Sequence, residues 1–395
     1  MSTVNPYPIR LGDAADFARD FARVRRFLAA AAFDEPRVCA ALKLDHIGEL
    51  IEPARDGIYL DELAAALRWC IQVFVQGVAV GEAESRAACG EDVFASLTAL
   101  GLLRADRARD AITCPVWLYP VDGVLIVSDR HREPDGRRSA APADAVFSAC
   151  FEGTLHFLHL LPEAAGGDAL DLCGGTGIGA LHLSRTASSA VTADVTPRAA
   201  CFAAFNAGLN DAPVESLCGD VYAAVGARQF DLIACHPPYL PAGGEASLSR
   251  DGGETGEDIT RRTIEGLPEH LRIGGVGVIA SLGCDRGDAP FERRAHDWLG
   301  AAAGEFGVAF GLLRTHSIEE IAGGIGRFGE DDAETAAWAA RLRARGVERF
   351  VYGVLVFKRH GTPTGLAPMR VPFAPTGCAA DLLALLEPGR PQAAR

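Results

Sequence analysis

The chain has 395 residues, of which 49% are hydrophobic and 23% are charged, and its formal net charge is −14. This length exceeds one ordinary core and suggests two domains. No apolar stretch approaches the roughly 20 residues of a membrane span, and an acidic chain without a basic stripe is a poor partner for nucleic acid. The first residues include early acids and no apolar run of a secretory signal, so we expect a cytoplasmic protein.

The cysteines and histidines indicate no metal site. None of the 11 cysteines forms a C-x-x-C pair, and the 10 histidines form no H-E-x-x-H pattern. Because the cysteine count is odd and the context is intracellular, we expect small buried thiols and no disulfide framework.

The N-terminal part combines helical spacing with a predicted hairpin. Apolar spacing predicts three helices, at 12–33, 60–78 and 91–100. Two apolar runs, 112–119 and 124–127, then flank a turn. Helices followed by a hairpin predict a winged-helix-like accessory domain over residues 1–140. Such a domain could bind nucleic acid, but its mildly acidic composition favours a lid or a substrate-docking role.

From about residue 150, apolar strands alternate with helices. The predicted strands are 168–173, 190–195, 214–218, 230–235, 276–283, 308–313 and 349–358. The predicted helices are 177–187, 196–209, 256–272, 291–303 and 333–345. This alternation predicts an α/β domain with a Rossmann-like, seven-stranded, mostly parallel sheet over residues 141–360, which binds ligands at the carboxyl ends of its strands. Residues 361–395 are expected to form a C-terminal extension.

A Gly-rich turn follows the first of these strands. Gly174, Gly175 and Gly177 allow a tight turn and a close approach of the backbone to a ligand, and a helix begins at about Gly177. Alone this is a weak signal, because nicotinamide, flavin and S-adenosylmethionine enzymes all use such a turn. The spacing does not match the dinucleotide G-x-G-x-x-G fingerprint well.

Polar residues also follow the next three strands. Asp194 could accept hydrogen bonds from both ribose hydroxyls, or could precede and cap the helix that begins near Pro197. Asp220 could accept one from an adenine amino group, although a solvated loop acid is the simpler interpretation. The fourth strand ends in the sequence HPPY at 236–239. Four such features at successive strand ends are hard to explain by structure alone.

Residues 168–283 resemble the class I S-adenosylmethionine-dependent methyltransferases, and within them the HemK/PrmC-type nitrogen methylases with an N/D-P-P-Y/F motif. The resemblance rests on DLCGGTG (171–177), TADVTPRAACFAAFNAGLN (192–210), LCGDVY (217–222), FDLIACHPPY (230–239) and RDGGETGEDITRRTIEGLPEHLRIGG (250–275). It implies S-adenosylmethionine as cofactor and S-adenosylhomocysteine as product. The cofactor contacts that it implies are Asp171, Cys173, Gly174, Gly175, Thr176, Gly177, Asp194, Asp220 and His236.

His236 stands where this family has Asn or Asp. In such enzymes the Asn oxygen and the first proline's carbonyl accept hydrogens from the substrate nitrogen, and the aromatic residue packs on the substrate. The resemblance therefore implies catalytic roles for His236, Pro237 and Tyr239, and acceptor contacts at His236, Pro237, Pro238, Tyr239 and Arg250. His236 itself could act as a general base, orient the acceptor or only end the strand. The Gly-rich loop 243–256 could be a mobile lid or a solvated linker.

The histidine determines which acceptor we expect. Because imidazole cannot deprotonate a weakly acidic glutamine amide, we expect a small-molecule acceptor, methylated on nitrogen or, less favourably, on oxygen. A protein glutamine-N5 methyltransferase, an RNA methyltransferase, and aminobutyrate transfer or cyclisation from S-adenosylmethionine are the alternatives. A homodimer is possible, and the sequence does not decide it.

Overall fold

The computed structural model of the chain describes residues 8–10, 14–52, 58, 60–107, 109–130, 132, 142–241, 248, 250–287, 289–326 and 332–387. The chain divides into two compact units. The first unit comprises Met1–Leu155, Gly175–His182 and Thr196–Ser216, and the second comprises His156–Gly174, Leu183–Val195 and Leu217–Arg395. This division follows contacts between residues, and the domain boundaries near 140 and 360 stay a prediction.

The first unit is mostly helical. Its helices are α1 (Ala14–Ala30), α2 (Glu35–Leu42), η1 (Ile47–Ile51), α3 (Ala65–Cys70), η2 (Ile71–Gln76), α4 (Glu82–Cys89), α5 (Glu91–Ala99), most of α7 (Ile178–Leu183) and α8 (Pro197–Asn210). Strands β1 (Val80–Gly81), β2 (Arg104–Asp106) and β3 (Ala111–Thr113) form a small sheet in the order β1-β3-β2. Helix α6 (Glu152–Leu160) begins in this unit and ends in the second.

The predicted hairpin is present but shorter than expected. Strands β4 (Trp117–Val121) and β5 (Val124–Ser128) pair in antiparallel fashion around the turn at Asp122-Gly123. The apolar run that begins at Ile112 does not continue into β4, because Ile112 pairs with β1 and β2 in the small sheet. One apolar run therefore supplies strands to two sheets.

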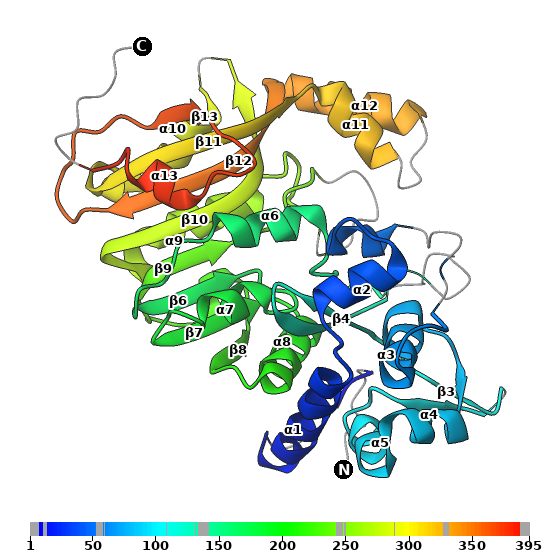
Figure 1. The fold of residues 1–395 in the computed structure, drawn as a ribbon. Helices are drawn as coiled ribbons and strands as arrows, with labels where there is room; N and C mark the ends of the chain where they lie inside the picture. Colours follow the sequence, from blue (N-terminus) through cyan, green and yellow to red (C-terminus); the bar gives the residue numbers. More distant parts are fainter. Residues whose placement is uncertain are drawn as a thin grey trace, which may run out of the picture. The chain divides into compact units, whose positions relative to one another are not determined.

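The second unit is built on one large sheet, which confirms the Rossmann-like α/β prediction (Figure 1). Its order is β13-β11-β12-β10-β9-β6-β7-β8. The strands are β6 (Asp168–Leu172), β7 (Ser189–Asp194), β8 (Val214–Cys218, whose residues up to Ser216 belong to the first unit), β9 (Phe230–Cys235), β10 (Leu271–Arg286), β11 (Phe306–His316), β12 (Val347–Arg359) and β13 (Met369–Pro372). The sheet is mostly parallel. The exception is β12, which pairs in antiparallel fashion with both β10 and β11.

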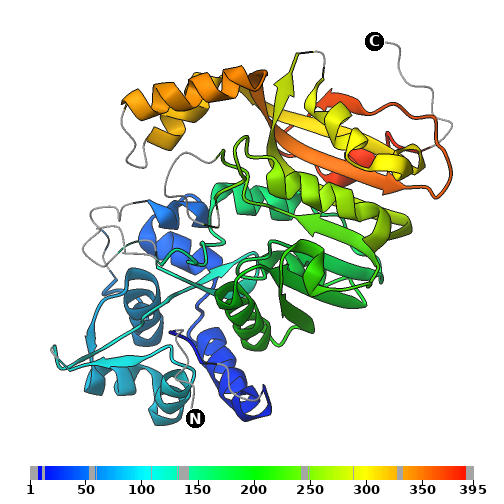
Figure 2. The same ribbon diagram turned by 180° about the vertical axis from the view of Figure 1, so that it is seen from behind.

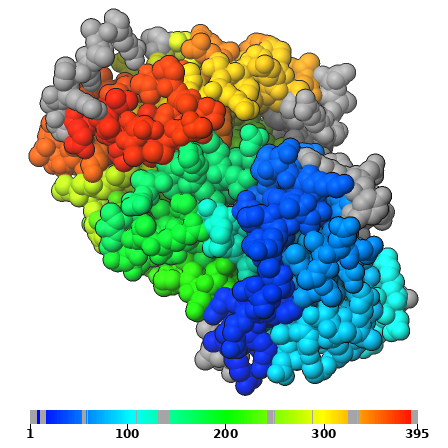
Figure 3. Space-filling view, in the orientation of Figure 1, coloured from blue at the N-terminus to red at the C-terminus, as the bar shows by residue number. Residues whose placement is uncertain are grey.

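The expected number of seven strands is wrong, because the described sheet has eight. The additional strand β13 lies in the segment that the sequence assigned to a C-terminal extension, and it pairs in parallel with Ala309–Leu312 of β11. On the surface, the red C-terminal segment accordingly lies beside the yellow segment that contains β11 (Figure 3).

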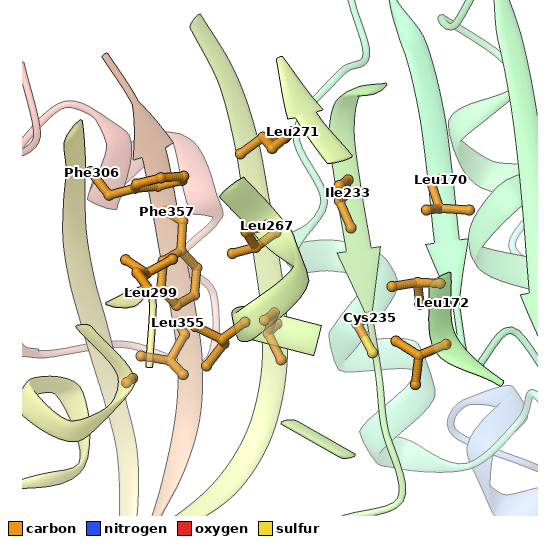
Figure 4. Close-up of a cluster of buried hydrophobic side chains, with 14 of the residues drawn as sticks. Leu170, Leu172, Ile233, Cys235, Leu267, Leu271, Leu299, Phe306, Leu355 and Phe357 are labelled. Atoms are coloured by element: carbon orange, nitrogen blue, oxygen red, sulfur yellow. The ribbon is translucent and has the colours of Figure 1, made fainter. Parts of the chain in front are cut away.

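Helices cover both faces of this sheet. Helices α9 (Asp258–His270) and α10 (Phe291–Asp297) lie on one face, which Figure 2 presents, and α13 (Ala379–Leu383) lies on the other (Figures 1 and 2). The short turns η3 (Val221–Ala224) and η4 (Gly300–Glu305) and the helices α11 (Ile318–Gly326) and α12 (Asp332–Ala344) complete the unit. Leu267 of α9 packs in the core with Ile233 of β9 and Leu355 of β12 (Figure 4).

Gly266 gives a prediction on the stability of this core. Alanine inside a helix is normally more stable than glycine by about 0.5–1 kcal/mol. Here a Cβ at Gly266 would lie 2.2 Å from Cε2 of Tyr222, whose hydroxyl donates to the carbonyl of Thr263. We therefore expect Gly266→Ala to lower the free energy of unfolding by about 1–3 kcal/mol. Urea unfolding of both proteins measures this, and a gain in stability would contradict the packing of Tyr222.

Candidate cofactor and acceptor site

The turn after β6 is tightly held in the second unit. Asp171 is buried, and Gly174 donates its backbone N–H to the carbonyl of Ala193 over 3.2 Å. A Cβ at Gly174 would lie 1.9 Å from Oγ1 of Thr192 and 3.0 Å from Oδ2 of Asp171, so only glycine fits. This close packing holds the turn against β7.

Cys173 occupies a backbone conformation that favours glycine. Its φ is +57°, in the left-handed region, where a side chain costs about 1–2 kcal/mol. The Cys173 side chain packs against the core cluster that includes Cys235, and a hydrogen bond with Cys235 together with burial raises the pKa of the Cys173 thiol. Glycine would adopt this conformation without that cost.

The rest of the Gly-rich turn lies in the first unit. Gly175 and Gly177 have φ of +53° and +77°. Between them the carbonyl of buried Thr176 accepts a hydrogen bond of 2.9 Å from Nδ2 of Asn206 on α8. Asn206 also accepts from the N–H of Val127 and donates to its carbonyl, at 2.8 and 3.0 Å. The sequence reasoning missed this buried amide, which supports both the turn and the hairpin edge.

The two acids at the next strand ends differ in their surroundings. Asp194 ends β7 with a partly exposed side chain, and its backbone carbonyl accepts from the N–H of Gly219 over 2.9 Å. The Asp220 side chain is 52% exposed and lies 2.7 Å from Nη2 of Arg262 on α9. Such an exposed ion pair contributes less than about 1 kcal/mol, so a ligand could displace Arg262.

His236, directly after β9, is enclosed by aromatic rings. Its ring stacks on Phe157 at 5.3 Å with an interplanar angle of 19°, and it lies 5.6 Å from the ring of Tyr239. Burial, and to a smaller extent the charge of the nearby His156, lowers the pKa of His236 to about 4. The imidazole is therefore neutral at neutral pH. Its Nε2 is buried and has no hydrogen-bond partner among the described residues.

An unpaired buried nitrogen normally costs about 1–3 kcal/mol and points to a missing partner. The two prolines that follow His236 have no N–H groups to offer it, and they leave the loop stiff. Nε2 can therefore receive a hydrogen bond from a ligand, or donate one in the other tautomer. Phe157, on α6, is a further residue that the sequence reasoning did not connect with this site.

Tyr239 connects the motif to the loop that follows it. Burial raises the pKa of Tyr239, while a hydrogen bond with Tyr352 and the charge of Arg250 lower it. Leu240 donates to the carbonyl of Arg250 over 3.0 Å, and a Cβ at Gly256 would lie 2.3 Å from the carbonyl oxygen of Tyr239. The loop thus returns to the motif at 250–256. The remainder of the expected lid, at 242–247 and 249, lies outside the described residues.

A buried acid that the sequence reasoning missed anchors this loop. Glu257 is 3% exposed and pairs with Arg286 and Arg294 at 2.8 and 2.5 Å. It also accepts hydrogen bonds from Thr255 at 3.3 Å and from the N–H of Cys284 at 2.9 Å. These contacts fix the end of the loop to β10 and α10, behind the motif.

The described residues contain neither a cluster of metal ligands nor a membrane-spanning helix. Within the described residues, no group of three or more His, Cys, Asp or Glu side chains could hold a metal ion. No helix in this part of the chain is long and apolar enough to cross a membrane. The expected absence of a metal and the cytoplasmic location stay predictions.

Comparison with known proteins agrees with the sequence resemblance. Residues 142–281 match the family described as "Methyltransferase small domain". Similar curated proteins include a ribosomal protein uL3 glutamine methyltransferase of Bradyrhizobium diazoefficiens (36% identity, 30% of this chain, 41% of the relative), a release factor glutamine methyltransferase of Koribacter versatilis (32%, 36%, 55%) and a ribosomal protein uL3 glutamine methyltransferase of Burkholderia pseudomallei (30%, 41%, 59%). The chain spans about half the length of these relatives.

Solved structures are similar only at a distance. A SAM-dependent methyltransferase from Agrobacterium tumefaciens aligns with a TM-score of 0.35 at 13% identity, over 62% of this chain and 70% of the other. The Trm5b structure from Pyrococcus abyssi aligns with a TM-score of 0.34 at 15% identity, over 63% and 58%.

These findings correct one expectation and confirm another. The small-molecule acceptor is wrong, because the matching relatives are named for glutamine methylation of proteins, ribosomal protein uL3 and release factors among them. The predicted resemblance of this region is confirmed, because residues 142–281 match the methyltransferase small domain.

Proposed function

We propose that the chain is an S-adenosylmethionine-dependent methyltransferase that methylates the side-chain amide nitrogen of a glutamine in a protein. The observation that carries this proposal is the enclosed, unpartnered Nε2 of neutral His236, at the end of β9 and next to a proline pair. The names of the relatives support the glutamine acceptor.

The cofactor would lie along the carboxyl ends of the strands. When bound, S-adenosylmethionine supplies an electrophilic methyl group and leaves as S-adenosylhomocysteine. Asp194 would accept from the ribose hydroxyls and Asp220 from the adenine amino group, in exchange for Arg262. The turn from Asp171 through Cys173 to Gly174 would cradle the cofactor with its backbone, and Gly175, Thr176 and Gly177 stay predicted contacts.

A neutral histidine suits a glutamine amide because it would orient the acceptor before transfer. Once the methyl group has transferred, the cationic N-methylated amide is strongly acidic, so it would lose one proton to the neutral imidazole or to water. The amide NH₂ group has two hydrogens. Nε2 of His236 would accept one, with the other ring nitrogen protonated, and the carbonyl of Pro237 would accept the second. Tyr239 would pack against the amide plane, with Pro238 and Arg250 beside it. Held this way, the nitrogen faces the methyl group, and orientation alone contributes several kcal/mol.

The accessory helices fit a docking role for a protein partner. Helix α3, η2, β1, helices α4 and α5, then β2 and β3 follow one another in the chain, and a winged-helix-like domain stays a prediction. Helix α5, which would face nucleic acid in such a fold, has an acidic first turn and packs on α1. There Oγ of Ser96 donates to Asp20 at 2.8 Å and accepts from Arg23 at 3.1 Å. An occupied, acidic face favours protein over nucleic acid.

Calorimetry tests the cofactor half of the proposal. Wild type should bind S-adenosylhomocysteine, and Asp194→Ala should weaken this binding at least tenfold, because two charge-assisted hydrogen bonds to the ribose are lost. Asp297→Ala, at an acid whose side chain is 67% exposed, serves as the control and should bind as wild type does. Absence of binding to wild type would overturn the proposed function.

Isotope transfer tests the acceptor half. Labelled S-adenosylmethionine is mixed with an unstructured peptide that contains one glutamine, and with the same peptide carrying glutamate instead. We expect label only in the glutamine peptide, recovered as N5-methylglutamine after complete proteolysis. Label in both peptides, or in neither, would contradict a glutamine acceptor.

A further inference from the structure

The connection between β11 and β12 places a pair of helices behind the acceptor motif. Helices α11 and α12 fill this connection and share a cluster of buried side chains with β10 and β12, formed by Leu282, Cys284, Ile318, Ala322, Trp338, Ala339, Leu342, Val347 and Phe350. Tyr239 and Tyr352 both pack against this cluster. The motif tyrosine is therefore backed by an element far from it in the chain.

Tyr352 is the direct link. It lies on β12, opposite Leu282 of β10, and its ring centroid is 5.8 Å from that of Tyr239 at an interplanar angle of 52°. The two hydroxyl-bearing side chains are joined by a hydrogen bond. The ring of Tyr239 in turn lies 5.6 Å from His236. Three rings thus connect β12 to the nitrogen that would hold the acceptor.

The residue directly after α12 contacts the loop that returns to the motif. Nη2 of Arg345 pairs with Oε1 of Glu254 at 2.5 Å. The same two residues line a cavity of about 140 Å³ together with Trp338, Arg341 and Leu342. Glu254 belongs to the loop that Gly256 holds against the Tyr239 backbone. The helices therefore border the motif through both its aromatic side chain and its loop.

We propose that Tyr352 is a positioning residue for the acceptor nitrogen, and that it acts by holding the Tyr239 ring in place from the α11–α12 side. This inference rests on the proposed function and deepens it. The hydroxyl of Tyr352 and the buried cluster of α11 and α12 both restrain the Tyr239 ring. The ring can therefore present a fixed face to the planar amide of the acceptor. Fixed geometry of this kind contributes to the rate of transfer and leaves cofactor binding unaffected.

Kinetics of Tyr352→Phe test the inference. The change keeps the ring and removes the hydroxyl, so kcat with the glutamine peptide should fall about tenfold while the affinity for S-adenosylhomocysteine stays within twofold. Tyr239→Phe should cause the same fall. The double variant should fall no further, since both changes remove one shared hydrogen bond. An unchanged kcat for Tyr352→Phe, or falls that multiply in the double variant, would overturn the inference.

Tyr119→Phe is the matched control. Its hydroxyl is also buried, accepting from the N–H of Ala149 at 2.8 Å and from Ser148 at 3.2 Å. Its loss should lower stability and leave kcat unchanged, so a fall in kcat there would point to a general effect of destabilisation and overturn the inference. The two proposals fail differently. A wild type that binds S-adenosylhomocysteine but methylates no glutamine peptide refutes the glutamine acceptor. An active wild type with an equally active Tyr352→Phe refutes only the role of Tyr352.

Discussion

Gly174→Ala should abolish detectable binding of S-adenosylhomocysteine and lower the free energy of unfolding by about 3 kcal/mol. The new Cβ would lie 1.9 Å from Oγ1 of Thr192, a separation that atoms cannot adopt, and 3.0 Å from Oδ2 of Asp171. Because Thr192 and Asp171 are both buried in the sheet, the turn must move instead. Overpacking of this kind costs about 1–3 kcal/mol and occasionally more. Calorimetry and urea unfolding measure the two effects.

A second substitution and a distant glycine make this test specific. Thr192→Ala removes Oγ1 and leaves Oδ2 of Asp171 at 3.0 Å and the Cβ of residue 192 at 3.3 Å from the new Cβ, so the double variant Gly174→Ala/Thr192→Ala should regain part of the lost stability. Gly304→Ala, where no atom lies within 4 Å of the new Cβ, should unfold and bind as wild type does. Undiminished ligand affinity in Gly174→Ala would refute a cradle formed by this turn.

The strands of the large sheet could be predicted because their apolar runs are bounded by turn residues. Strand β9 matches its expected range of 230–235, and β7 and β8 differ by no more than one residue. The longer strands were underestimated at their ends. β10 begins at Leu271, five residues early, because Leu271 pairs with Phe230 across an irregularity before Val276. Such pairing depends on a neighbour and leaves no periodicity in the strand itself.

Strand β13 could not be predicted for a related reason. Its four residues, with a proline at the end, are too few for a strand pattern, and they become a strand only because β11 offers them an edge. The sequence therefore gives an extension where the fold has a sheet edge. The strand β1 of the N-terminal part was missed for the same reason, because its two residues are too few for a strand pattern.

The sequence was enough to predict where the site lies, but not the protonation state of His236. The end of β9 and the HPPY motif identify His236 from the sequence alone. The neutrality of its imidazole depends on burial and on the nearby His156, and Phe157 of the same helix α6 stacks on its ring. A solvated histidine would titrate near pH 6.5 and could act as a base. The expectation of a small-molecule acceptor came from that assumption, and burial removes it.

His236→Ala should lower kcat about a hundredfold and leave the affinity for S-adenosylhomocysteine nearly unchanged. The substitution deletes the nitrogen that would orient the acceptor, and misplacement by about 1 Å costs on that order. His236→Asn should retain most of the activity, because the amide oxygen can accept the same hydrogen bond. Steady-state kinetics with the glutamine peptide measure kcat, and calorimetry measures the affinity. Equal activity of the Ala variant and wild type would leave His236 a purely structural role.

The pH dependence of stability and activity further distinguishes wild type from His236→Asn. Because the folded-state pKa of His236 is about 4, below its ordinary 6.5, the unfolded chain binds a proton first as the pH falls. The contribution of neutral His236 to stability is complete above pH 6.5 and is lost between pH 6.5 and 4. His236→Asn has no such group, so its unfolding free energy relative to wild type should rise between pH 7.5 and pH 4.5. Activity of wild type should likewise stay level from pH 8 to 6, since the imidazole remains neutral throughout. A wild-type activity that falls near pH 6.5, and no longer does so in His236→Asn, would instead identify a solvated base and refute the orienting role.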